Sequence, residues 1–350
     1  MNASGPGPDP RLAVPPDRHQ ALFTAKLRAL VRARWSTDDG VDGPFPGGAT
    51  LRAGDTGWVL VGEDGARRLG GAMAWARQQR VVDLHLLADD PTAAGILARR
   101  AALFVRPPTV WRVDGRMVSL APPSPPARFA VLPPTAELFR PLLLAAGLEV
   151  QVEQGELLAE VNGLEVARVV SAVEDGSDAR LEVGVGRFDR EAFAMMNAGL
   201  PDAEALAKAA QIVRDIRRPD APRHQLNQLA PERWRRAAVV ADPSLVGAAT
   251  LVPVESALPR PNLKASAPAT AVGTDLDGQP LVVVCSSGVD LDLVPSAADD
   301  RLAHAPAARL LLALPARDVL PVTEAFAAAL VDPAEIVTVE AGWTQPARPA

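Results

Sequence analysis

The chain has 350 residues, of which 48% are hydrophobic and 22% charged, with a formal net charge of −6. This balance is that of a globular protein, and the length is sufficient for two domains. No stretch approaches the roughly 18 uninterrupted apolar residues of a membrane span, and the N-terminus lacks the order of a signal peptide. The single cysteine excludes an intrachain disulfide, and the four histidines form no HxxxH or HExxH pair. The sequence therefore predicts a cytoplasmic protein that does not associate with a membrane.

The N-terminal part of the folded chain is predicted to be an α/β unit over residues 18–125. Proline and glycine dominate residues 1–17, so we expect a disordered tail there. From Arg18 to Trp35 apolar residues recur at helical spacing. The proline-rich segment 121–126 is typical of a linker and sets the first boundary. The expected elements are helices 18–35, 69–79 and 91–104, strands 58–61 and 81–87, and a hairpin over 110–120.

Two further segments follow. We expect residues 126–260 to form a middle α+β segment with a basic helical region, and residues 261–342 to form a C-terminal α/β unit before a tail at 343–350. The expected elements are helix 135–146, extended segments 156–173 and 179–185, helices from 190 to about 240, strand 281–284, acidic segment 289–294, strand 309–314, helix 319–330 and strand 335–339. The predicted fold class is α/β, with two or three small mixed-sheet units and flanking helices.

The first and last units share a local pattern. Residues 82–86 and 88–90 read VDLHL and ADD, while residues 289–293 and 298–300 read VDLDL and ADD. An ancient duplication would produce this similarity, and so would a bias toward Ala, Asp and Leu. The spacing holds for only the first dozen residues, which favours composition.

The strongest candidate for chemistry is a carboxylate set in the last unit. If residues 289–293 are a strand, Asp290 and Asp292 share one face about 6.5 Å apart. Together with Asp277 they could hold Mg²⁺ through oxygen ligands, and Lys264 could stabilise a phosphoryl transition state. The alternative interpretation is an edge strand with one solvated acidic face.

The last unit also resembles a known family. An acidic residue before a turn, an apolar strand and alternating helices and strands over residues 264–340 are similar to the core of PD-(D/E)XK nucleases. Asp277 stands where that family has an aspartate. Cys285 and Ser287 stand where the resemblance requires an acidic residue and a lysine. The resemblance therefore implies a nuclease-like core without an intact metal-dependent cleavage site.

A second pair of carboxylates lies in the middle segment. If the two extended segments pair, Glu165 and Glu182 approach each other across strands, as acid/base or metal sites require. Polar faces of a hairpin explain the same residues. His85, next to Asp83, is expected to be hydrogen-bonded scaffolding and not a catalytic base.

A basic segment stands out from the acidic chain. Residues 208–236 contain eight basic and three acidic residues, a net charge of +5. Arg233, Arg235 and Arg236 could contact phosphates while Trp234 stacks on a base. The alternative is an internal match between these arginines and the acidic remainder of the chain.

The unique thiol is not expected to be a nucleophile. Cys285 follows the apolar run 281–284, which is typical of a strand buried on both faces. We expect a buried thiol with a raised pKa.

The sequence favours a binding or regulatory component without an intact catalytic site and without a cofactor, with nucleic acid or another protein as its partner. The alternative is a Mg²⁺-dependent nuclease or phosphoesterase that uses Asp277, Asp290, Asp292 and Lys264. Whether the chain is an enzyme depends on whether those side chains converge.

Overall fold

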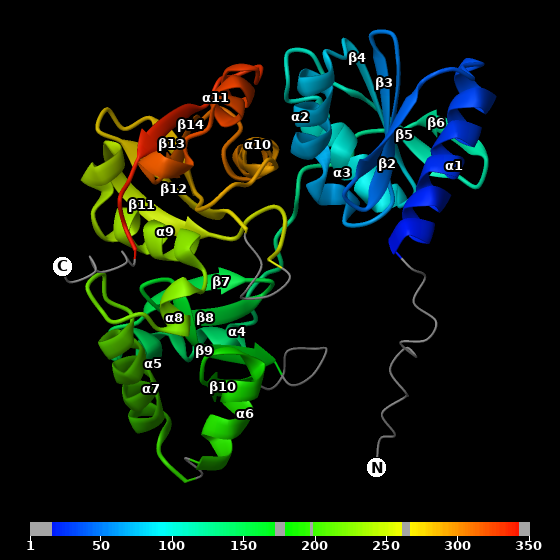
Figure 1. Ribbon diagram of the computed structural model, residues 1–350. Helices are drawn as coiled ribbons and strands as arrows, with labels where there is room; N and C mark the ends of the chain where they lie inside the picture. The colour runs from blue at the N-terminus through cyan, green and yellow to red at the C-terminus, as the bar shows by residue number, and fades with distance from the viewer. Residues whose placement is uncertain (1–15, 172–178, 197–198, 261–266, 343–350) are drawn as a thin grey trace, which may run out of the picture. The chain divides into compact units, whose positions relative to one another are not determined.

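The computed structural model describes residues 16–171, 179–196, 199–260 and 267–342, without the side chains of 16, 17, 187–189, 193 and 194. The predicted tails, except for Pro16 and Asp17, therefore lie outside the described residues. The chain divides into two compact units, residues 1–125 and 126–350. It is an α/β protein with sheets of six, four and five strands and flanking helices, which confirms the predicted fold class (Figure 1).

The first unit is a six-stranded sheet covered by helices on both faces. Its elements are α1 (Pro16–Trp35), β1 (Val41–Phe45), β2 (Gly48–Ala53), β3 (Thr56–Val61), α2 (Leu69–Gln79), β4 (Asp83–Ala88), α3 (Pro91–Ala101), β5 (Thr109–Asp114) and β6 (Met117–Leu120), with strands in chain order. Five of the six residues of β3 are buried, so both of its faces need a cover. Leu27, Leu30 and Val31 of α1 cover one face, and α2 and α3 contact the parallel strands. The side chain of Asp90 caps α3 ahead of Pro91.

The second unit begins with a four-stranded antiparallel sheet in the order β10-β9-β8-β7. Its elements are α4 (Pro134–Glu137), α5 (Arg140–Ala145), β7 (Glu149–Glu153), β8 (Glu156–Val161), β9 (Leu164–Ser171), β10 (Ala179–Val183), α6 (Gly186–Met196), α7 (Asp202–Ile216) and α8 (Gln225–Gln228). Leu157, Ala159 and Val161 alternate along β8 toward a core that α7 completes with Leu206 and Ala210. One face of this sheet is therefore apolar and covered.

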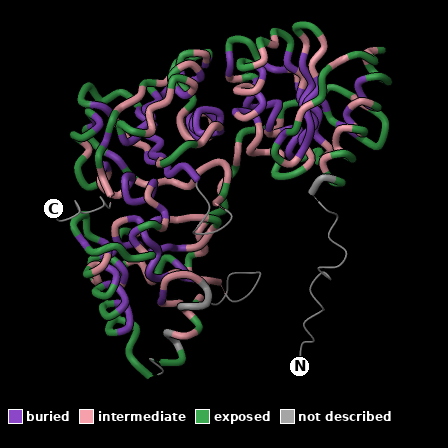
Figure 2. The backbone as a smooth tube through the Cα atoms, viewed as in Figure 1, coloured by how far each residue is buried: buried purple, intermediate pink, exposed green. Residues whose placement is uncertain are grey.

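The last sheet has five strands in the order β11-β12-β13-β14-β15. Its elements are α9 (Pro231–Ala241), β11 (Ala248–Val254), β12 (Ala269–Asp275), β13 (Pro280–Cys285), α10 (Leu293–His304), β14 (Arg309–Leu314), α11 (Pro321–Ala328) and β15 (Glu335–Thr338). Val239 of α9 packs on Leu281 and Val283, while α10 contacts β13 and β14. Figure 2 shows the resulting concentration of buried residues along the central strands.

The first and last sheets are built in the same order. In each, a helix precedes three antiparallel strands, and two crossover helices then lead to two further strands that pair in parallel. The similar segments that suggested a duplication do not correspond to each other, because residues 83–86 belong to β4 whereas residues 289–292 precede α10. The two sheets therefore share a topology, but the sequence similarity between residues 82–90 and 289–300 does not arise from equivalent positions in it.

Several predicted elements need correction. Strands β1, β2, β7, β11 and β12 were not expected; β1 and β11 contain proline, which edge strands tolerate. The extended segment 156–173 is split by a turn at Asn162 and Gly163 into β8 and β9. Residues 289–292 are not a strand. Among the described residues, no helix combines the length and the apolar character that crossing a membrane requires.

Candidate ligand-binding site

The middle sheet has a polar face opposite its apolar core. Along β7, Val150 and Val152 pack against the core, so Glu149, Gln151 and Glu153 project from the other face. Glu160 of β8 lies on that polar face and is buried, with 2% of the residue exposed. A carboxylate so far from water needs charged or hydrogen-bonding partners. Helix α9 provides them.

Two arginines one turn apart on α9 bind this face. Arg233 donates from Nη1 to Glu160 Oε1 at 2.6 Å and from Nη2 to Glu153 at 2.6 Å. Arg236, three residues further on, donates from Nη2 to Glu160 Oε2 at 2.8 Å. Gln151 Nε2 donates to Glu160 Oε1 at 2.8 Å. Glu160 is thus held by three donors from two elements.

The turn between β8 and β9 allows this close approach. Gly163 has φ +69°, and a Cβ there would lie 2.3 Å from the carbonyl carbon of Arg233. A side chain at this position would push α9 away from the sheet, so the contact requires glycine on both steric and conformational grounds.

Contacts between oppositely charged groups keep the members of this network ionised. Burial alone would raise the pKa of Glu160, but the adjacent guanidinium groups of Arg233 and Arg236 lower it below the ordinary value. Burial likewise disfavours the charged form of Arg233, but Glu160 and Glu153 raise its pKa. Both groups are therefore ionised at neutral pH.

Residues of the basic segment make contacts inside the second unit. Arg235 donates to the carbonyl oxygens of Val339 at 2.9 Å and Ser286 at 2.7 Å, which ties α9 to the ends of β15 and β13. Trp234 is buried, and the Arg217 guanidinium lies 4.5 Å from its ring centroid.

Arg233, Arg235 and Arg236, the predicted phosphate contacts, do not face solvent in this structure. All three arginines are buried, and their described partners are protein oxygens. For Arg233 and Arg236 the internal charge match, which the sequence offers as the alternative, is the arrangement present.

A pocket of about 180 Å³ opens beside this network. Its lining comes from β7, β8, α9 and β11: Glu149, Val150, Gln151, Glu160, Arg236, Ala237, Val240, Ala241 and Pro253. The two oxygens of Glu149 accept from the backbone N–H groups of Asn162 at 2.9 Å and Gly163 at 3.0 Å. Desolvation of that carboxylate, together with the negative charge of Glu160, raises the pKa of Glu149. The pocket thus has apolar walls and one polar end.

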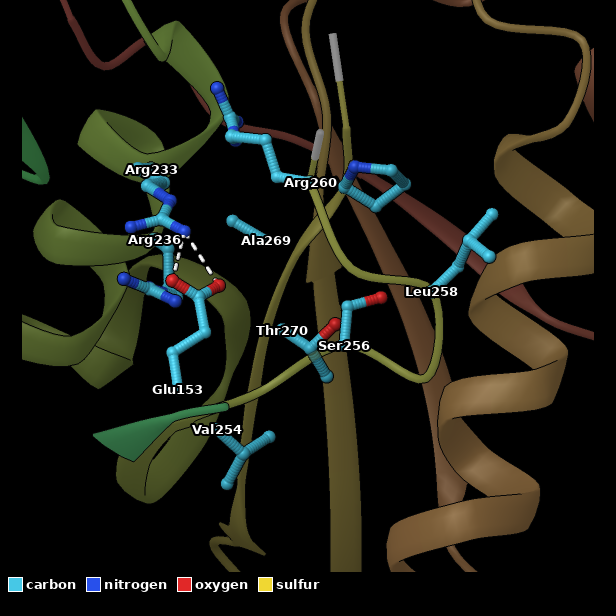
Figure 3. A pocket seen from close by; sticks show the side chains of 10 residues that line it. Glu153, Arg233, Arg236, Val254, Ser256, Leu258, Arg260, Ala269 and Thr270 are labelled. Carbon is cyan, nitrogen blue, oxygen red and sulfur yellow. Dashed lines mark hydrogen bonds and ion pairs between the residues drawn. The ribbon is translucent and has the colours of Figure 1, made fainter. Parts of the chain in front are cut away.

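A second, smaller cavity is also lined by Arg236 (Figure 3). Its lining includes Arg233, Glu153 and Arg260, together with the hydroxyl residues Ser256 and Thr270. Its volume of about 10 Å³ is at the lower limit for one water molecule. Arg236 borders both spaces, but only the larger one can hold an organic ligand.

The predicted metal site is not assembled by its three carboxylates. Asp277 lies in the turn before β13, whereas Asp290 and Asp292 follow the other end of that strand. The six residues of β13 separate them, and the five rises of about 3.3 Å between its ends amount to roughly 17 Å. Asp290 Oδ1 accepts from the backbone N–H of Asp292, and Lys264 lies outside the described residues. The part of the chain that the structure describes contains no group of three or more His, Cys, Asp or Glu side chains arranged to hold a metal ion.

The other sequence candidates have structural roles. Glu165 and Glu182 do approach each other, bridged by Arg190 at 2.8 and 3.4 Å. His85 Nδ1 accepts from Trp111 Nε1 at 3.2 Å, as expected of scaffolding. Cys285 is fully buried, and burial raises its pKa to about 12, which confirms the expectation for the thiol.

Sequence reasoning singles out Arg236, as a phosphate contact, but misses the other residues that line the pocket. The alternation E-V-Q-V-E over residues 149–153 is a signal for a strand with one polar face. Nothing local indicates that α9 covers that face, because Arg233 and Glu160 are 73 residues apart. Comparison of the chain with protein-family models, curated proteins and solved structures finds no match.

Proposed function

We propose that this chain is a non-catalytic binding or regulatory component of the cytoplasm, and that its ligand is a small organic molecule held in the pocket between β7 and α9. The observation that carries the proposal is the combination of a 180 Å³ space, apolar walls and a polar end already fixed by the Glu160 network. Concave, mostly apolar sites with a few prepositioned polar groups are the usual form of small-molecule sites.

The size of the space limits the ligand to a compact body. A cavity of about 150 Å³ lined by apolar side chains accommodates benzene. The pocket here is somewhat larger, so it suits one six-membered ring with a short substituent. Val240 and Pro253 offer the ring an apolar contact surface.

The site also suits a regulatory role. Its lining joins strands of the middle sheet to α9 and β11 of the last sheet. A ligand that contacts both sheets would bind only the conformation in which α9 covers the polar face. Binding would therefore increase the population of that conformation. Nucleic acid is not part of this proposal, since the arginines that suggested it are buried.

The test is saturation-transfer NMR of the full chain with two single-ring probes, toluene and benzamide. We expect transfer to at least one probe in the wild type, and its loss in Ala237→Leu, because the added side chain occupies the pocket. Ala238→Leu is the matched control: this neighbouring residue of α9 is also partly exposed but does not line the pocket. Transfer to neither probe, or transfer that persists in Ala237→Leu, would overturn the proposal.

A further inference from the structure

The polar end of the pocket contains a cation that is already neutralised. Arg236 is paired with Glu160, and Arg233 is shared between Glu160 and Glu153. The charges of these four groups cancel. Glu149, the remaining carboxylate of the lining, already accepts from the backbone N–H groups of Asn162 and Gly163. A ligand that brought a further full charge into this space would therefore find only charged groups that already have partners, and burying an unpaired charge is costly.

Hydrogen-bonding capacity nevertheless remains at this end. Gln151 gives its Nε2 to Glu160, which leaves the amide oxygen Oε1 as an acceptor. Arg236 has five N–H donors and, among the described contacts, directs one hydrogen bond to Glu160. The site therefore offers both a donor and an acceptor.

We propose that the ligand of this pocket carries a neutral carboxamide-type head on its apolar ring. The carbonyl oxygen accepts from Arg236, and the N–H donates to Gln151 Oε1. This inference rests on the proposed function, which requires only that a small apolar body occupy the pocket, and it adds the chemistry of the head group.

Charged head groups fit less well. A carboxylate would accept from Arg236 but would lie near Glu149 and Glu160. An ammonium group would approach carboxylates whose oxygens already accept hydrogen bonds from protein groups, and it would also approach Arg236. For each charged head group, repulsion and desolvation offset part of the favourable binding free energy. A neutral head that matches the hydrogen-bonding groups avoids this cost, and such matching discriminates strongly between analogues.

The experiment is isothermal titration of the full chain with four probes that share a ring and differ in the head: benzamide, benzoate, benzylamine and toluene. We expect benzamide to bind tightest, at least tenfold tighter than either charged probe. Tighter binding of benzoate or benzylamine, or equal binding of benzamide and toluene, would overturn the inference on the head group. Absence of binding by all four probes would instead refute the proposed function.

A variant separates the head-group contact from the integrity of the pocket. Gln151→Met keeps the length of the side chain and removes both its acceptor and the Nε2 donor to Glu160. We expect benzamide to bind about three- to tenfold more weakly, the ratio that one hydrogen bond provides, while toluene changes less than twofold. Equal loss for both probes would mean that the variant deforms the pocket, and unchanged binding of benzamide would contradict the proposed contact.

Discussion

The first and last sheets share one order of elements but use their covering helices differently. In the first unit, α1 buries Leu27, Leu30 and Val31 on its own sheet. In the second, α9 covers its own sheet with Val239 and turns Arg233 and Arg236 toward the middle sheet. The same arrangement of helix and strands thus provides a closed core in one case and one wall of a pocket in the other. What differs is a second sheet whose polar face requires cationic partners.

The largest expected effect comes from breaking the contact between Glu160 and the arginines of α9, which the first sheet lacks an equivalent of among its described residues. Glu160→Leu leaves the buried guanidinium of Arg236 without its anion and removes one partner of Arg233. Breaking a buried ion pair from one side destabilises a protein by about 3–5 kcal/mol. We expect this loss in the free energy of unfolding of the second unit, measured by amide exchange of β8 and β13 in increasing urea.

The first unit provides the internal control: α1 forms its own ion pairs, Lys26 with Asp89 and Arg28 with Asp42, so its β3 amides should exchange as in the wild type. A second control is Glu335→Leu, which removes an exposed partner of Arg309 and should change little. An unchanged second unit in Glu160→Leu would show that the network does not hold α9 on the sheet.

An intermediate effect is expected at the matching ends of β3 and β13. Val61 and Cys285 are the last residues of these strands, and both are buried. Val61→Thr and Cys285→Ser each place a hydroxyl in an apolar environment, which costs about 1–3 kcal/mol without a partner. Urea unfolding followed by amide exchange should show each loss in its own unit. Rapid reaction of native Cys285 with a maleimide at neutral pH would contradict the burial on which this prediction depends.

How far the sequence predicts this fold depends on whether a pattern is local. Continuous apolar runs such as 281–284 and 309–314 predict strands buried on both faces, and the structure has β13 and β14 there. The Asp90-Pro91 pair likewise indicates the start of α3. By contrast, β11 contains Pro253 and follows basic helices, so turn signals compete with its strand pattern and the sequence does not predict this strand.

The pocket could not be predicted from the sequence, for a different reason. Net charge distinguishes residues 208–236 from the rest of the chain, but charge alone does not tell an arginine that faces solvent from one that faces a distant glutamate. Only the pairing of α9 with β7 and β8 decides between them. The Asp-rich segments 82–90 and 289–300 show the converse, since similar residues occupy a strand followed by a helix in one case and a loop followed by a helix in the other.

The smallest effect is a pH dependence confined to the first unit. On the face that α1 covers, His85 lies among Trp35, Trp58 and Trp111, with ring centroids 5.3–6.0 Å from its own. The corresponding face of the last sheet carries aliphatic residues such as Leu281 and Leu311. Desolvation lowers the pKa of His85 below its ordinary value of 6.5; Asp83 opposes this shift and Arg34 adds to it.

Because the folded pKa lies below the unfolded one, the unfolded chain binds the proton more readily. The stability that neutral His85 confers is complete above about pH 6.5 and is lost as the pH falls from there toward the folded value. We expect the urea midpoint, followed by tryptophan fluorescence, to fall between pH 7.5 and 5.5 in the wild type. His85→Gln keeps an acceptor for Trp111 Nε1 but does not titrate, so its midpoint should fall less over that range. Taking the difference between the two chains cancels every titration they share, and equal slopes would exclude His85 as the source of the pH dependence.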